Sequence, residues 1–102
     1  MSAATAIGRD EVLKILRQHR EELRRLGVRR LGLFGSHLHG TAGPESDIDL
    51  LVGFDRPSFD DYMETKFLLE ELFARKVDLV SEGALKAALD HVREEAVYVE
   101  GL

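Results

Sequence analysis

The sequence predicts an α/β (α+β) fold, in which a small mixed β-sheet is flanked by helices in the order α-β-α-β-α-β-α. Three observations lead to this prediction. Apolar residues recur with helical spacing near the start of the chain, short apolar runs rich in branched residues follow, and segments of helical pattern separate those runs. Such alternation is typical of one sheet covered by helices. A length of 102 residues suits one domain, so we expect residues 1–102 to form a single domain with a flexible start over 1–8.

The first half of the chain predicts one helix, one strand and a short helical turn. Over residues 10–26, charge fills one helix face and the other face carries Val12, Leu13, Leu16, Leu23 and Leu26. Gly27 is typical of a helix end. The apolar run at 31–34 predicts a buried strand that leads into Gly35, and residues 36–46 predict one helical turn followed by a loop.

The second half predicts two more strands and two more helices. Residues 47–52 and 77–80 are rich in branched apolar side chains and are predicted strands. Ser58 and Asp61 have capping-box-like spacing, which predicts the start of a helix. The inward-facing stripe expected on that helix comprises Phe59, Met63, Phe67 and Leu72. A last helix is expected from Ser81, with Leu85, Leu89, Val92 and Ala96 along one side.

Composition excludes several classes of protein. The chain has no cysteine, which excludes disulfides and thiolate-zinc sites. It has no apolar stretch of the length that a membrane helix needs, and residues 1–8 lack the basic start and apolar core of a secretory signal. We therefore expect a cytoplasmic protein with no membrane association.

The net charge of −5 is unevenly distributed, because basic residues predominate over 9–30 and acids over 45–102. Strong non-specific binding to nucleic acid depends on neutralising many phosphates, so direct nucleic-acid binding is not expected. The basic segment could meet an acidic partner or a nucleotide, or could be an ordinary solvated helix face.

Asp47 and Asp49 are the first candidate site residues. The period of two along a strand places both carboxylates on one face, which suits joint binding of a hard cation such as magnesium. A buried face rarely tolerates two like charges, so the alternative for an isolated Asp-x-Asp pattern is a solvated face. The sequence just upstream favours the site, because a strand there ends in Gly35-Ser36, a turn that can expose N–H groups and a hydroxyl to a phosphate. Asp78, inside the next apolar strand, is the candidate third acid.

The segment GSHLHGTAGPESDIDLLV joins these features, with ten residues between Gly35-Ser36 and Asp47-Ile48-Asp49. It resembles the signature of the DNA polymerase β-like nucleotidyltransferase superfamily, and the chain length resembles that of its minimal (MNT) branch. The resemblance extends from the first helix to Asp78 and beyond. It implies the fold of that superfamily, a phosphate contact from Gly35 and Ser36, ATP as substrate, and two Mg²⁺ ions held by the metal-binding and catalytic carboxylates Asp47, Asp49 and Asp78.

The sequence departs from the family pattern after the Gly-Ser turn. Minimal members commonly have Ala-Arg-Gly there, whereas this chain has Leu38-His39-Gly40. His39 could contact phosphate in place of the arginine, but its contribution would be weaker and sensitive to pH. For His37 and His39, a phosphate contact and an exposed polar helix face remain alternatives.

The resemblance also implies a function. Minimal members commonly pair with a helical HEPN protein in toxin-antitoxin systems, in which the nucleotidyltransferase is the antitoxin. It thus implies transfer of AMP from ATP to a hydroxyl, with a tyrosine of the HEPN toxin as acceptor and pyrophosphate as product. The alternative is a catalytically weak nucleotide-binding antitoxin that neutralises its partner by contact alone.

Overall fold

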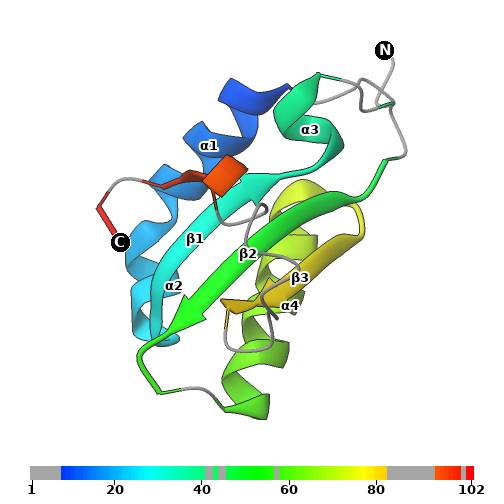
Figure 1. Cartoon of the computed structure of the whole chain (residues 1–102). Coiled ribbons are helices and arrows are strands. Elements are labelled where there is room, and N and C mark those ends of the chain that lie inside the picture. Colours follow the sequence, from blue (N-terminus) through cyan, green and yellow to red (C-terminus); the bar gives the residue numbers. More distant parts are fainter. Residues whose placement is uncertain (1–7, 41–42, 44–45, 57, 83–93, 100) are drawn as a thin grey trace.

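The structure is a computed structural model that describes residues 8–40, 43, 46–56, 58–82, 94–99 and 101–102. Its sheet contains β1 (Val28–Phe34), β2 (Ile48–Phe54), β3 (Val77–Ser81) and β4 (Val97–Tyr98) in the spatial order β3-β2-β1-β4. β1 runs antiparallel to β2 and β4, whereas β2 and β3 are parallel. The mixed sheet and its helices confirm the predicted fold class (Figure 1).

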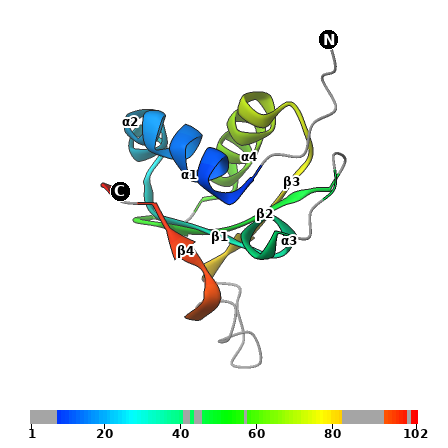
Figure 2. The same ribbon diagram turned by 90° about the horizontal axis from the view of Figure 1, so that it is seen from above.

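The three longer helices lie on one side of the sheet, as Figure 2 shows. They are α1 (Arg9–Gln18), α2 (Arg20–Arg25) and α4 (Phe59–Phe73), and the short α3 (Ser36–His39) follows β1. Their buried side chains meet those of the strands in one apolar core, which includes Leu16, Leu23, Leu33, Leu50 and Leu69. No helix in the described part of the chain is long and apolar enough to cross a membrane.

The prediction of one helix over residues 10–26 is wrong, because the helix is interrupted at His19. The backbone of His19 has φ −110° and ψ 17°, outside the helical range, so the hydrogen-bond ladder ends and begins again. The ring Nδ1 of His19 lies 2.9 Å from the carbonyl oxygen of Ile15. The apolar spacing survives the break, since Leu16 and Leu23 are both fully buried.

The start of α4 is confirmed, and so is the inward position of Leu72, which packs against the core, but the rest of the predicted inward face is not. The hydroxyl of Ser58 accepts a hydrogen bond from the Asp61 N–H at 3.0 Å, as the capping spacing predicted. However, 76% of Phe59 and 59% of Phe67 are exposed. The fully or nearly buried residues of α4 are Thr65, Leu69 and Phe73. Apolar residues surround most of this helix, so its spacing fits more than one face and does not identify the one that packs on the sheet.

The end of the chain also differs from the prediction. The predicted last helix lies mostly on residues 83–93, outside the described residues. Ser81 is the last residue of β3, and Ala96 directly precedes β4. The Val99 N–H continues the pairing with β1 by donating to the Leu31 carbonyl at 2.8 Å.

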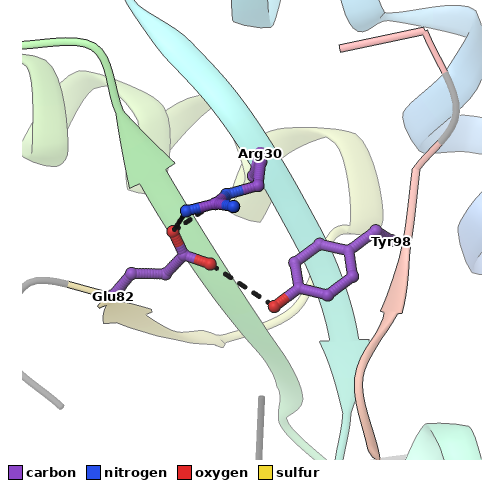
Figure 3. Close-up of polar contacts among 3 residues, drawn as sticks. All are labelled: Arg30, Glu82 and Tyr98. Carbon is purple, nitrogen blue, oxygen red and sulfur yellow. Dashed lines mark hydrogen bonds and ion pairs between the residues drawn. The ribbon is translucent and has the colours of Figure 1, made fainter. Parts of the chain in front are cut away.

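A polar network links β4 and β1 to Glu82, the residue that directly follows β3 (Figure 3). The Arg30 guanidinium donates to Oε1 of Glu82 from Nε at 3.1 Å and from Nη2 at 2.8 Å. The Tyr98 hydroxyl donates to Oε2 of the same carboxylate at 3.3 Å. Glu82 therefore connects β1 with β4 at the end of β3, with only 10% of its side chain exposed.

Candidate active site

The turn after β1 is the first part of the candidate site. Gly35 has φ 79°, in the left-handed region that favours glycine. A methyl group at this position would collide with the carboxylate of Asp49. The pairing of Phe34 with Asp49 across β1 and β2 explains this closeness. Ser36, the predicted phosphate contact, begins α3 directly after this turn.

Three carboxylates meet where β2 and β3 begin. Asp49 and Asp78 are register partners on these parallel strands, and Asp47 precedes β2 by one residue. The Ile48 N–H donates to the Lys76 carbonyl at 3.1 Å, which fixes the entry of both strands. The structure thus brings together the three acids that the sequence singled out, beside the Gly35 turn.

The surroundings of Asp49 oppose its negative charge. Burial is the largest cause of a raised pKa of Asp49, followed by the charges of Asp78 and Asp47 and by a side-chain hydrogen bond with Asp78. The carboxyl group is therefore held between two like charges in a partly buried position. Such a cluster is unfavourable without a compensating positive charge.

A hard cation fits the chemistry of this cluster, since every donor is a carboxylate oxygen. Within the described ranges, no group of three His, Cys, Asp or Glu side chains already has the arrangement of a metal site. The like charges that raise the pKa of Asp49 are the ones that a cation would neutralise.

The two histidines of α3 have different surroundings. His37 is 1% exposed, and among the described residues neither ring nitrogen has a hydrogen-bond partner of regular geometry. Burial, followed by the charge of Arg75, lowers the pKa of His37, while the nearby backbone of Asp47 acts in the opposite direction. An exposed face is therefore wrong for His37. His39 is exposed, with its Nε2 atom 3.5 Å from Oε2 of Glu95, and its phosphate contact stays a prediction.

Tyr62 of α4 is a residue near the site that the sequence analysis does not single out. Its hydroxyl donates to the Leu79 carbonyl at 2.5 Å. Burial, and then the charge of Asp78, raises the pKa of Tyr62, so this side chain from α4 lies within the electrostatic reach of the site. The helical pattern gave no signal for this position, because its importance arises from the packing of α4 on β3.

Comparison with known proteins gives consistent matches. A family model described as a nucleotidyltransferase domain matches residues 16–99. A protein adenylyltransferase, MntA, of Thermococcus cleftensis is 43% identical over 93 residues, which cover 88% of this chain and 94% of that protein. A structure described as a minimal nucleotidyltransferase has 38% identity and a TM-score of 0.70, covering 83% of this chain and 93% of the other.

A more distant structure shares the fold. It holds a tri-AMPylated HEPN toxin of Shewanella oneidensis in complex with an MNT antitoxin. The matching chain has 19% identity and a TM-score of 0.62, over 88% of this chain and 73% of its own length.

Proposed function

Because the chain belongs to the nucleotidyltransferase domain family, we propose that it transfers AMP from ATP to a protein hydroxyl. The acceptor is a tyrosine of a helical HEPN toxin, and the chain acts as the antitoxin. The name of the Thermococcus cleftensis relative and the AMP-bearing toxin in the Shewanella oneidensis complex support this proposal. The observation that carries it is the placement of Asp49 between the Gly35 turn and Asp78.

Each part of the site has a role in this reaction. Gly35 leaves room for a phosphate-bearing ligand to approach Asp49, and Ser36 contacts the triphosphate. Asp47, Asp49 and Asp78 would hold Mg²⁺, which when bound neutralises phosphate charge and lowers the pKa of the acceptor hydroxyl. Asp78 orients the acceptor, because it lies on the edge strand β3, on the side of Asp49 away from the Gly35 turn.

The transfer is a substitution at the α-phosphorus of ATP. The acceptor oxygen forms a bond to this phosphorus while the bond to the oxygen that bridges the α- and β-phosphates breaks. Pyrophosphate leaves with the electron pair, and Asp78 receives the hydroxyl proton. Positioning and charge neutralisation supply most of the rate, as is usual for reactions at phosphorus.

The proposal predicts that a HEPN protein is encoded next to this chain. The test uses that HEPN protein. This protein is incubated with the chain, ATP and Mg²⁺, and its intact mass is measured. We expect the added mass of AMP, with a loss of at least 100-fold in rate for Asp49→Asn and for Asp78→Asn. Calorimetry should show that Asp78→Asn keeps more of the Mg²⁺-ATP affinity than Asp49→Asn does.

Two results would contradict the proposal, the first its enzymatic role and the second its assigned site. A tight complex with an unmodified toxin would indicate neutralisation by contact alone. That outcome is the one favoured by the pairing of His39 with Glu95 in place of an arginine that faces phosphate. Equal transfer by the wild type and by Asp49→Asn would place the reaction at another site.

A further inference from the structure

The helix α4 has a second apolar face that the core does not use. We call it the outer stripe, formed by Phe59, Met63 and Phe67. These residues follow one another at spacings of four, so they lie on one side of the helix. Phe59 and Phe67 are 76% and 59% exposed, and Met63 is half-buried between them. A different side of α4 carries its core residues, Leu69 and Phe73.

An exposed aromatic stripe is costly unless something covers it. A phenylalanine side chain buries roughly 150–250 Å² when it packs, so two exposed rings forgo a large stabilisation. Single exposed apolar residues are common, but a row of them along one helix marks a contact surface. A helix that is apolar on two sides is typical of one that packs against two neighbours.

The charges beside the outer stripe indicate the chemistry of its partner. Asp60, Glu64 and Glu71 are all exposed. Glu64 is three residues before Phe67 and Glu71 is four after it, so these acids border the stripe. Lys66 is the only basic residue in the sequence of α4. A complementary surface therefore combines apolar side chains with Lys or Arg.

The outer stripe continues into a pocket at the edge of the sheet. This pocket has a volume of about 550 Å³, and Phe59, Phe54 and Tyr62 line it together with residues 79–81 of β3. β3 is the edge strand, and Asp78 directly precedes the pocket-lining part of it. Figure 1 shows α4 beside β3. A protein bound along α4 would therefore reach the edge strand β3, which carries Asp78 on its opposite face.

We propose that the outer stripe docks an amphipathic helix of the toxin partner. Apolar residues of that helix cover Phe59, Met63 and Phe67, and its Lys or Arg residues meet the acids that border the stripe. This inference rests on the proposed function, because it takes the partner to be the helical HEPN protein. It adds the face of the chain that binds and the chemistry that the partner presents.

The experiment measures the affinity of the HEPN protein for three variants by calorimetry. Phe67→Ser should raise the Kd at least tenfold, because it removes the exposed ring that lies between Glu64 and Glu71 along the helix. Glu64→Lys combined with Glu71→Lys should also raise the Kd, and should weaken its dependence on salt. Glu21→Lys, an equally exposed acid on α2, is the control and should bind as the wild type does. Thermal unfolding and Mg²⁺-ATP binding should match the wild type in every variant.

Transfer kinetics separate docking from catalysis. In Phe67→Ser the KM for the toxin should rise while the rate at saturating toxin stays near that of the wild type. Wild-type affinity in both α4 variants, with transfer intact, would overturn the docking surface and leave the proposed function standing. No binding or transfer by the wild-type chain would overturn both. Sedimentation of the chain alone gives a further test, since a dimer that Phe67→Ser dissociates would assign the stripe to a second copy of this chain.

Discussion

The surroundings of Asp49 are unfavourable for its negative charge. Its raised pKa means that it binds a proton more tightly in the folded than in the unfolded chain. The stabilising contribution of this group is therefore present below the ordinary carboxyl pKa and is lost as pH rises through the folded pKa. In the metal-free chain, the charged form of Asp49 therefore opposes folding.

Replacing this charge should stabilise the metal-free protein. In EDTA at pH 7, we expect Asp49→Asn to raise the free energy of unfolding by up to about 1 kcal/mol, a small gain because solvent screens part of the repulsion. The amide can also donate to Asp78. Added Mg²⁺ should then raise the melting temperature of the wild type more than that of the variant. Glu11→Gln, on the exposed surface of α1, should change neither value, and a lower melting temperature for Asp49→Asn in EDTA would contradict the repulsion argument.

Gly35 and Gly40 form a matched pair for testing the turn. Both have a left-handed backbone, with φ 79° and φ 76°, but only Gly35 lies against Asp49, whereas nothing lies within 4 Å of a methyl group built on Gly40. Both alanine variants share the backbone strain, so the difference between them reports the collision. Urea unfolding should show Gly35→Ala to be less stable than Gly40→Ala by roughly 1–3 kcal/mol. Mg²⁺-ATP affinity should fall only in Gly35→Ala, and equal losses would place the effect in the backbone alone.

Some residues of the site could be predicted from the sequence and others could not. The acids at 47, 49 and 78 stand out because charge inside an apolar strand pattern has few structural explanations. His37 does not stand out, since a four-residue helix has no periodicity from which burial can be predicted. Tyr62 gains its place only when α4 packs on β3.

At the level of elements, the sequence predicted where most of them start but not which faces pack. Capping and glycine signals are local, so Ser58 and Gly27 marked boundaries correctly. The sheet decides which face of α4 packs inward. The apolar residues of α4 are spaced so that either of two faces could have packed. The break at His19 had no local signal, because the apolar spacing continues through it.

The cap of α4 can be tested by its own substitution. Ser58→Ala should lower the free energy of unfolding by about 1 kcal/mol, because the Asp61 N–H loses its acceptor. Ser58→Asp should retain most of the stability, since aspartate also accepts at this position and suits the positive end of the helix. Urea unfolding of the three proteins measures both effects. An alanine variant as stable as the wild type would show that water replaces the cap without cost.

At the scale of the whole molecule, two polar clusters lie at opposite ends of the sheet. The acids lie where β2 and β3 begin, and the Glu82 network lies where they end. β4 was not predicted, because two residues are too few for a strand pattern and their pairing with Gly32 and Leu33 is set by the tertiary fold. The network therefore provides the side-chain link between β4 and the strands that carry the site.

Loss of the Glu82 charge should loosen β4 selectively. We expect Glu82→Gln to lower stability by about 1–2 kcal/mol and to speed hydrogen exchange of the Val99 amide, which bonds to Leu31. Asp55→Asn removes the exposed ion pair with Arg29 at 3.1 Å and should cost less than about 0.5 kcal/mol. Exchange spectra and urea unfolding of both variants test this. Unchanged protection of Val99 in Glu82→Gln would show that backbone pairing alone holds β4.

The parallel pairing of β2 and β3 has a consequence for the order in which the protein is made. Parallel neighbours need a crossover, and here α4 is that crossover. A ribosome therefore releases the Gly35 turn and Asp49 first, then the whole of α4, and only then Asp78. A chain truncated within α4 would carry Asp47 and Asp49 but would lack β3, the strand that carries Asp78. Acquisition of the complete site during synthesis is thus abrupt, and it waits for the emergence of β3.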